Sequence, residues 1–557
     1  MQKNYPLYED VQISKDFKDL LDLQAQKFPS KAAFSFMKDG MDVTVTRREF
    51  RDQVNVLGTA FCAMGLRKKH IAVLGDNCYP WLLSFFTVLA SDNVVVPVDK
   101  ELTFDEIMNV LSHSDSDAVF FTRRYEKHFR ERAAEMPNIE YFVCFEPSQP
   151  SEGRFLSFDE LLEKGAQLFD EGDRTYLSVT ADSEALADIV YTSGTTGVAK
   201  GVMLSRKALL SCACEARRVT YLGERCLSVL PYNHTYEATC GIIASYNAGC
   251  SICINESLKT VADNLKKYKP DFIMLVPLFA ENFYKKIWKT LEKQGKDKTV
   301  SRAIKMSNAL RRVGIDARRK IFAQIHEVFG GELRQIICGG APIRPEIADF
   351  FDGIGIILQN GYGITECSPL ISVNRPKFNN YESVGVVLPC GEVRIDDPDE
   401  NGEGEILYRG DNVMLGYYKN PEATAEVLKD GWFYTGDFGK YENEQLFITG
   451  RKKNLIVLKN GKNVYPEEIE GYVLNVLEVE EVVVRSIKDA SGAEIGLLAE
   501  IYPMPSFSEG KSKEELEQYF MKAIDEAMKD VTGYKRIQKV QIRDTEFPKT
   551  TSRKIKR

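Results

Sequence analysis

The sequence predicts an α/β protein whose large N-terminal region consists of β-sheets covered by helices. A small β-rich subdomain and a smaller α+β C-terminal domain are predicted to follow. Three observations support this fold class: the length of 557 residues, the alternation of strand-like and helical segments in the first half, and a change of pattern after Pro389. A chain of this length exceeds the usual size of a single core, so several structural units are expected.

In the first half, short β-branched runs alternate with segments of helical spacing. The runs "HIAVLG" and "NVVVPVD" are typical of buried strands, whereas "PWLLSFFTVLAS" and "TFDEIMNVLSH" carry the apolar spacing of helices. This alternation indicates crossover units and therefore a parallel sheet with helices on its faces.

After Pro389 the sequence changes to short runs broken by Gly, Asp and Asn, as in "GEVRIDDPDENGEGEILYRG", which predicts the β-rich subdomain. The last segment holds strand-like runs, a charged helical stretch and a basic tail. We expect the boundary near Gly450 to Lys453, which gives a large domain over residues 1–450 and a small domain over residues 451–557.

Composition excludes several classes of function. The net charge is -8 and the pI is about 5.6, which argues against a protein that wraps nucleic acid, so no nucleic-acid partner is expected. The first residues, "MQKNYPLYED", lack the apolar region of a secretory signal, and no apolar run approaches the roughly 18 residues of a membrane span. We therefore expect the twelve cysteines to be reduced thiols. We expect a cytoplasmic protein, peripheral at most to a membrane.

The stretch "YTSGTTGVAKGVMLS", residues 191–205, is rich in glycine and hydroxyl side chains and carries one lysine between two strand-like runs. Its spacing differs from the Walker A motif. Glycines allow backbone N–H groups to approach a phosphate, hydroxyls donate to its oxygens and the ammonium balances its charge. The alternative is a flexible turn. We interpret the loop as a triphosphate cradle formed by Thr192, Ser193, Gly194, Thr195, Thr196, Gly197 and Lys200.

Five further motifs follow that loop in order. They are "GGAP" (339–342), "NGYGITE" (360–366), "YTGD" (434–437), "GRKKNLIVLKNGKNVYPEEIE" (450–470) and "PKTTSRKIKR" (548–557). With these motifs the chain resembles the AMP-forming adenylating enzymes, a family that includes acyl-CoA synthetases, luciferases and the adenylation domains of peptide synthetases. The resemblance implies ATP and Mg²⁺ as cofactors.

The resemblance also implies roles for individual residues. The adenine site would be lined by Gly339, Gly340, Ala341, Pro342, Asn360, Gly361 and Gly363, with the ring of Tyr362 stacked on the base. Thr365 would contact the α-phosphate, and Glu366 would hold Mg²⁺, an ion that takes few protein ligands. Asp437 would accept the ribose hydroxyls with support from Arg451. The structural alternatives are a turn cap for Asp437 and an ordinary surface acid for Glu366.

By the same resemblance, Lys554 would reach from the C-terminal domain to neutralise charge between the carboxylate and the α-phosphate. An ionised carboxylate and a pyrophosphate leaving group need positioning and charge stabilisation more than a general base. Lys453 matches the hinge position about which the C-terminal domain rotates. Arg553 departs from the glycine that family members commonly carry before the catalytic lysine.

The stretch "LPYNHTYEATCGI" lies where the family has a gate near the acyl site, so His234 and Tyr236 are candidates for lining it, His234 as a catalytic-site residue. This stretch and "PDFIMLVPLFAENFYKKIW" look most like the long-chain fatty acyl-CoA synthetase branch. The segment 285–320 holds thirteen Lys or Arg against three acidic residues. It fits either a membrane-surface helix or, as such charge runs more often indicate, a solvated face.

The predicted function is a two-step ligase. A medium- or long-chain fatty acid and MgATP give acyl-adenylate and pyrophosphate, and coenzyme A then takes the acyl group as AMP leaves. Two alternatives remain within enzymes: another acid, such as an aromatic one, or an acyl carrier protein as acceptor. An alternative from a different class is a catalytically silent nucleotide-binding regulatory protein.

Overall fold

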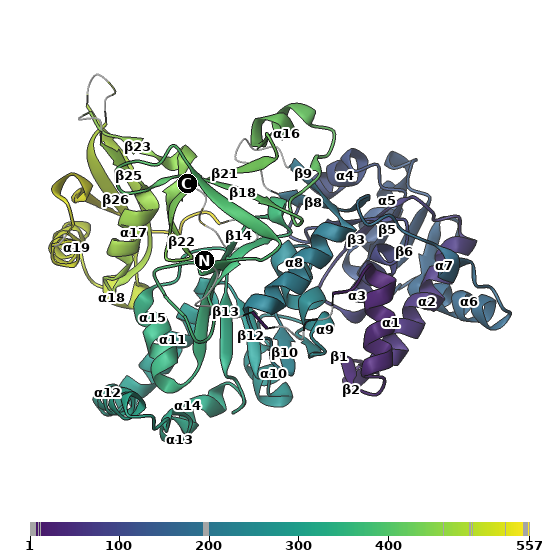
Figure 1. Ribbon diagram of the computed structural model, residues 1–557, viewed down its shortest axis with the longest axis horizontal. Helices are drawn as coiled ribbons and strands as arrows, with labels where there is room; N and C mark the ends of the chain where they lie inside the picture. The colour runs from purple at the N-terminus through teal and green to yellow at the C-terminus, as the bar shows by residue number, and fades with distance from the viewer. Residues whose placement is uncertain are drawn as a thin grey trace.

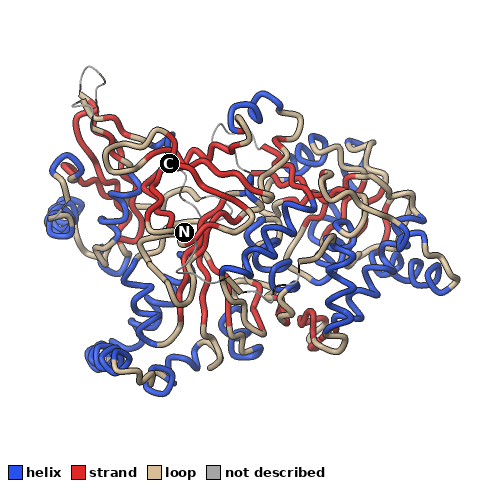
Figure 2. Tube along the Cα trace, viewed as in Figure 1, coloured by secondary structure: helices blue, strands red, loops and turns tan. Residues whose placement is uncertain are grey.

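The computed structural model describes residues 7–8, 11, 13–192, 200–459, 462–489, 492, 494–529, 531–549 and 555. Two large mixed sheets pack in the N-terminal part, a smaller antiparallel sheet follows, and the last part forms its own α+β unit (Figure 1). Helices surround the strands on the outer faces of both large sheets (Figure 2). The predicted fold class is confirmed.

The first large sheet has eight strands, and its middle is parallel because helices connect consecutive strands. In spatial order they are β19 (Gly416–Tyr417), β9 (Lys200–Ser205), β8 (Leu186–Thr192), β4 (Val94–Val98), β3 (His70–Leu74), β5 (Ala118–Phe121), β6 (Tyr141–Cys144) and β7 (Phe155–Ser157). Its helices are α2 (Arg47–Ala63), α3 (Tyr79–Leu89), α4 (Phe104–His113), α5 (Glu126–Arg132), α6 (Phe158–Asp170) and α7 (Thr175–Ser178).

The second large sheet has nine strands. Their order is β16 (Val386–Val387), β15 (Leu370–Val373), β14 (Ile357–Gly363), β13 (Gln335–Cys338), β12 (Phe272–Leu275), β10 (Arg225–Ser228), β11 (Ser251–Ile254), β1 (Ala32–Lys38) and β2 (Met41–Thr46). Its helices are α1 (Phe17–Lys27), α8 (Arg206–Val219), α9 (Ala244–Asn247), α10 (Val261–Tyr268), α11 (Pro277–Lys293), α12 (Asp297–Arg312), α13 (Arg318–Ile321), α14 (Ala323–Val328) and α15 (Pro345–Ile354).

One apolar core joins the two large sheets. It includes buried side chains from both, such as Val95 on β4 and Ile252 on β11, together with rings from α2 and α3. A second core, which includes Phe351, packs the outer face of the nine-stranded sheet against α11 and α15. Large apolar side chains are buried on both faces of the nine-stranded sheet, which explains why its strands are continuous hydrophobic runs in the sequence.

The predicted β-rich subdomain after Pro389 is an antiparallel sheet in the structure. It consists of β17 (Gly391–Asp396), β18 (Gly404–Gly410), β20 (Leu428–Lys429), β21 (Trp432–Glu442) and β22 (Gln445–Arg451), with α16 (Pro421–Val427) beside it. The chain then makes a short helical turn over Lys452–Asn454.

The last part of the chain forms a separate core around a three-stranded sheet. Its elements are β23 (Ile456–Val457), β24 (Asn463–Val464), α17 (Pro466–Leu474), β25 (Val479–Lys488), β26 (Glu494–Pro503), α18 (Pro505–Ser508), α19 (Lys513–Ala527) and β27 (Ile537–Ile542). Two polar contacts tie this unit to the N-terminal part. Lys285 Nζ lies 2.8 Å from Glu480 Oε2, and Arg344 Nη1 donates to the Leu474 carbonyl at 2.8 Å.

No helix within the described residues combines the length and the apolar character that crossing a membrane requires.

Candidate active site

Two of the predicted adenine motifs lie side by side because "GGAP" follows β13 and "NGYG" forms the end of the neighbouring parallel strand β14. Cys338 at the end of β13 is in register with Asn360 on β14, so "GGAP" leaves β13 beside "NGYG". Asn360 is buried, and its Oδ1 has no hydrogen-bond partner among the described residues. A buried acceptor left unpaired costs free energy, and the exocyclic amine of a bound adenine would supply the missing donor. The motif therefore fits the base.

The predicted ribose carboxylate is buried between two partners from distant parts of the chain. Asp437 is 3% exposed. Its Oδ2 accepts a hydrogen bond from the Tyr362 hydroxyl at 2.7 Å, and its Oδ1 lies 3.0 Å from Arg451 Nε. Burial raises the pKa of Tyr362 well above its usual value, so its hydroxyl stays protonated and donates. Antiparallel pairing of β21 with β22 places Asp437 opposite Arg451.

The candidate magnesium ligand and the loop lysine meet at a residue that the sequence analysis missed. The Tyr417 hydroxyl donates to Glu366 Oε1 at 2.8 Å, while Lys200 Nζ lies 4.8 Å from the centroid of the Tyr417 ring. Pairing of β19 with β9 holds this tyrosine in place. In the sequence, Tyr417 is marked only by the aromatic pair in "LGYYKN", and no motif spacing connects that pair with Glu366.

The two runs that flank the glycine-rich loop form a pair of adjacent strands, as predicted. β8 and β9 pair antiparallel, with Thr192 opposite Lys200. The loop residues Ser193, Gly194, Thr195, Thr196 and Gly197 lie outside the described residues, so their roles stay predictions.

Lys554 and Arg553 also lie outside the described residues, and the role of Lys554 remains a prediction. Nearby, Lys549 forms an isolated antiparallel bridge with Ile555. The predicted hinge residue, Lys453, lies in the helical turn that follows β22. Its neighbour Lys452 is paired with Glu405 at 2.6 Å.

The candidate acyl-site stretch forms a π-helix over Tyr236–Ile243. Tyr236 donates to the Ile337 carbonyl at 2.9 Å, and a Cβ added to Gly339 would lie 3.1 Å from its ring, so the acyl candidate packs against the adenine motif. His234 precedes this helix and is half-buried. π-Helical turns occur often at functional sites.

Glu237, in the same helix, is a second residue that the sequence analysis missed. It is 1% exposed and accepts a hydrogen bond from the Ser228 hydroxyl. Burial raises its pKa to about 8, so the carboxyl is largely protonated at neutral pH. Its only sequence signal is an acid inside the apolar run "YEATCGII".

These contacts bring residues from four of the motifs together in two charged clusters. One is Asp437 with Arg451 and Tyr362, and the other is Glu366 with Tyr417 and Lys200. The family model described as "AMP-binding enzyme" matches residues 21–418. The chain belongs to this family. The resemblance expected from the sequence motifs is thereby confirmed.

Curated relatives cover most of the chain. A long-chain-fatty-acid–[acyl-carrier-protein] ligase of Arabidopsis thaliana chloroplasts is 28% identical over 84% of this chain and 74% of its own. A long-chain-fatty-acid–CoA ligase of Mycobacterium tuberculosis is 28% identical over 85% of this chain and 80% of its own.

Solved structures share the fold. An anthranilate CoA ligase in complex with anthranoyl-AMP superposes with a TM-score of 0.76 at 20% identity, covering 98% of this chain and 96% of its own. A Mycobacterium tuberculosis fatty acyl CoA synthetase gives 0.64 at 22% identity, covering 97% and 96%. At these identities the likeness shows the fold alone.

We expect Tyr417→Phe to weaken use of MgATP. The change removes the hydrogen bond to Glu366 but keeps the ring beneath Lys200, and a hydrogen bond to a charged group contributes about 1.5–3 kcal/mol. The KM for MgATP should rise about tenfold or more, with a smaller change in KM for the acid. Steady-state pyrophosphate release measures both. Tyr418→Phe is the control because the Tyr418 hydroxyl donates to Asp115 instead. Equal kinetics for the two variants would show that the contact with Glu366 does not matter.

Glu237 should make stability depend on pH. The carboxyl titrates at about 8 in the folded chain against 4.5 as a free group, so between these values the folded chain binds the extra proton. The free energy of unfolding therefore falls as pH rises through that window, by up to about 1.4 kcal/mol per pH unit. Glu237→Gln should flatten this slope in denaturant titrations, whereas the exposed Glu327→Gln should leave it unchanged. An unchanged slope in Glu237→Gln would contradict the assignment.

Proposed function

We propose that the protein activates a fatty acid with ATP and transfers the acyl group to coenzyme A, with AMP and pyrophosphate as products. The observation that carries this proposal is the convergence of two nucleotide-binding clusters at one edge of the nine-stranded sheet. A carboxylate buried against Tyr362 and Arg451 supports ribose binding, and a carboxylate joined through Tyr417 to Lys200 supports metal and triphosphate binding.

The site residues fit the proposed nucleotide and metal. Glu366 offers a carboxylate oxygen, and Mg²⁺ takes its remaining ligands from phosphate oxygens and water. The metal, when bound, neutralises phosphate charge. Lys200 stands at the base of the loop where the β- and γ-phosphates would lie, and Thr365 precedes Glu366 on the same turn.

In the first proposed step, a carboxylate oxygen of the fatty acid attacks the α-phosphorus of ATP. The bond from that phosphorus to the bridging oxygen of the β-phosphate breaks, and pyrophosphate leaves. Lys554 stabilises the charge between the two reacting groups. In the second step, the coenzyme A sulfur attacks the acyl carbonyl carbon, the thiol proton is lost to solvent and AMP leaves, after rotation of residues 451–557 about Lys453.

The names of the relatives favour a long acyl chain as substrate and are consistent with two acceptors of the acyl group. Their names include both long-chain-fatty-acid–CoA ligases and a long-chain-fatty-acid–[acyl-carrier-protein] ligase. We place His234 and Tyr236 at the acyl site because the Tyr236 ring packs against Gly339 of the adenine motif. Coenzyme A is the proposed acceptor, and an acyl carrier protein is the alternative.

We also propose that the protein contacts membranes peripherally through the segment 285–320. This segment runs from within α11 through α12 into α13, holds thirteen basic residues and exposes the apolar side chains of Met306 and Val313. Basic and apolar side chains on one helical surface favour binding at an anionic lipid interface. Such a location would place the protein where fatty acids partition, at the cytoplasmic face of a membrane.

Pyrophosphate release with a panel of acids from acetate through oleate to benzoate tests the function. We expect release that depends on medium- or long-chain acids, with matching acyl-CoA and AMP when coenzyme A is present. If pyrophosphate is released without acyl-CoA, and an acyl thioester forms only when holo-acyl carrier protein is added, the carrier protein is the acceptor. Release that depends on benzoate alone would contradict the fatty-acid assignment.

The same assay with Lys554→Ala separates a ligase from a silent nucleotide-binding protein. A ligase should lose adenylate formation by several orders of magnitude while its ATP affinity changes little, because the lysine acts on developing charge. Lys556→Ala, two positions along the same tail, is the matched control. A wild-type chain that binds ATP but releases no pyrophosphate with any acid would support the regulatory alternative.

A further inference from the structure

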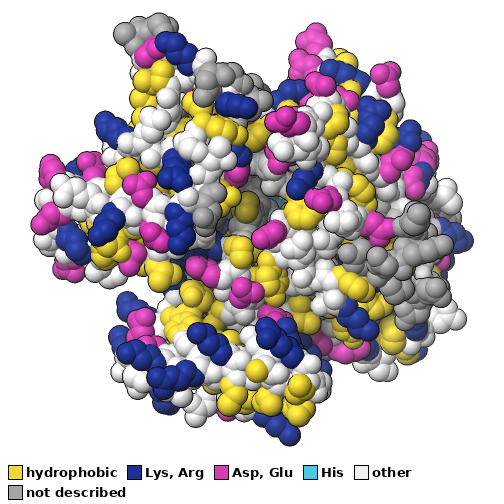
Figure 3. Space-filling view, turned by 60° about the vertical axis from the view of Figure 1, so that its left-hand side comes forward, with side chains coloured by type: hydrophobic (Ala, Val, Ile, Leu, Met, Phe, Trp, Pro, Cys, Tyr) yellow, Lys and Arg dark blue, Asp and Glu magenta, His cyan; other side chains and the backbone are white. Residues whose placement is uncertain are grey.

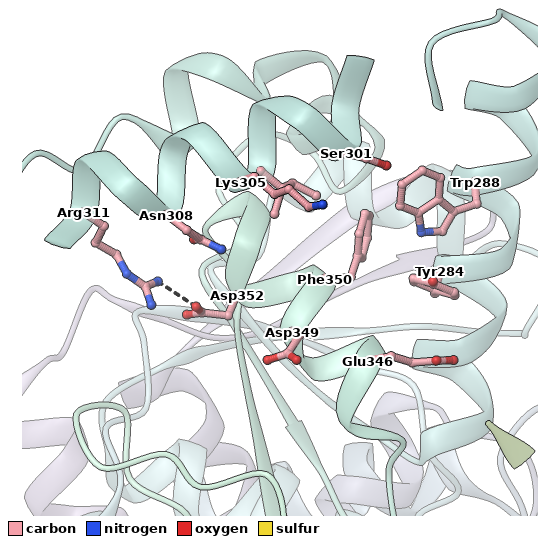
Figure 4. Close-up of a pocket in the computed structure, with 11 residues that line it drawn as sticks. Tyr284, Trp288, Ser301, Lys305, Asn308, Arg311, Glu346, Asp349, Phe350 and Asp352 are labelled. Atoms are coloured by element: carbon pink, nitrogen blue, oxygen red, sulfur yellow. Dashed lines mark hydrogen bonds and ion pairs between the residues drawn. The ribbon is translucent and has the colours of Figure 1, made fainter. Parts of the chain in front are cut away.

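A groove of about 450 Å³ lies between α11, α12 and α15, and none of the residues assigned to the nucleotide lines it. Figure 4 shows its side chains: α12 forms the upper wall, α15 the floor and α11 the right-hand end. In Figure 1, α11, α12 and α15, the three helices that line it, lie together at the lower left of the view. The proposed reaction does not use this groove.

Three aromatic rings line one end of the groove. Tyr284 and Trp288 come from α11 and Phe350 from α15. Their centroids lie 5.1 to 6.1 Å apart, and the Tyr284 ring stands nearly perpendicular to that of Phe350, at 81°. The faces of such rings attract cations, most strongly where water is partly excluded.

Two carboxylates one turn apart on α15 border the rings. Asp349 has no ion-pair partner among the described residues. Glu346 Oε1 lies 3.5 Å from Arg344 Nη1 and forms no hydrogen bond with it, and Nη1 donates to the Leu474 carbonyl. Burial raises the pKa of both carboxyls. Glu346 therefore faces the charge of Arg344, whereas Asp349 is a carboxyl at this end of the groove that no ion pair balances within the described residues.

The wall formed by α12 has the opposite character. Arg311 is paired with Asp352 at 2.6 Å, whereas Lys305 forms no ion pair within the part of the chain that the structure describes. Trp288 Nε1 is a buried donor without an acceptor, and the Glu346 and Asn308 side-chain oxygens are buried acceptors without donors. Buried polar atoms are nearly always paired in folded proteins. A ligand that carries both N–H donors and anionic oxygens would pair with these buried atoms.

We propose that this groove binds the phosphoethanolamine headgroup of a membrane phospholipid. The ammonium lies against the three rings and donates to Glu346 and Asp349, and the phosphate oxygens accept from Lys305 and from Trp288 Nε1. A primary ammonium fits better than the trimethylammonium of choline, which has no N–H to pair with the buried acceptors. This inference deepens the proposed membrane contact and rests on that part of the proposed function.

The surrounding surface favours a lipid over a soluble phosphoamine. Met306, Val313 and Ile315 on and after α12 are 58%, 72% and 55% exposed. The lowest lobe in Figure 3 carries yellow apolar and dark blue basic side chains intermixed. Large apolar side chains exposed among basic ones are suited to the headgroup and upper acyl region of a bilayer.

Vesicle flotation of the full chain, without ATP or fatty acid, tests the inference independently of catalysis. Phosphatidylglycerol content is held constant while phosphatidylcholine is replaced by phosphatidylethanolamine. We expect the replacement to strengthen binding about fivefold or more, and soluble O-phosphoethanolamine to compete. Asp349→Asn should abolish this dependence, whereas Glu292→Gln, an exposed carboxylate on α11, should retain it.

Trp288→Phe provides a second variant, since it keeps an aromatic ring and removes the indole N–H together with part of the ring surface. It should weaken the preference for phosphatidylethanolamine with the fold intact by circular dichroism. Equal binding to phosphatidylcholine and phosphatidylethanolamine vesicles would overturn the inference, as would a preference that survives Asp349→Asn. No vesicle binding, or capture of an acidic acyl carrier protein by this face instead, would overturn it too. None of these results bears on pyrophosphate release, so the ligase proposal stands or falls separately.

Discussion

The buried carboxylate of Asp437 constrains the arrangement of the whole site. A charge with 3% exposure is tolerated only with partners, and its partners come from two other strands. Tyr362 belongs to the nine-stranded sheet, and Arg451 ends the last strand before the C-terminal part. Through Tyr362, Asp437 therefore connects the β-rich subdomain to the nine-stranded sheet. Through Arg451, it holds the start of the C-terminal part beside the candidate nucleotide site.

The second cluster extends the same arrangement across both large sheets. Tyr417 is an edge residue of the eight-stranded sheet, yet its hydroxyl contacts Glu366, which follows the nine-stranded sheet's β14. The backbone adds to this contact, because Met414 N donates to the Glu366 carbonyl at 2.8 Å. Lys200 and Glu366 thus both contact Tyr417. The nucleotide would bind where the two large sheets meet.

Much of the fold was predictable because its signals are local. The runs flanking the glycine-rich loop predicted the β8–β9 hairpin, and alternation of strand and helix patterns predicted the parallel core. Tyr417 and Glu237 were missed because their meaning depends on tertiary contacts. Tyr417 meets Glu366 across 51 positions, and Glu237 is defined by burial that its sequence neighbours do not encode. The groove was missed for the same reason, since it exists only where α11, α12 and α15 pack together.

The affinity of Asp437→Asn for ATP, measured by calorimetry against the wild-type chain, tests the central claim most directly. The substitution keeps the size of the side chain and an acceptor for Tyr362, but removes the charge that pairs with Arg451 and, in the proposed complex, accepts from the ribose hydroxyls. The account predicts binding weaker by about tenfold or more, with Asp430→Asn in the exposed turn before β21 unchanged. Wild-type affinity in a folded Asp437→Asn chain would contradict the claim that this carboxylate organises the nucleotide site.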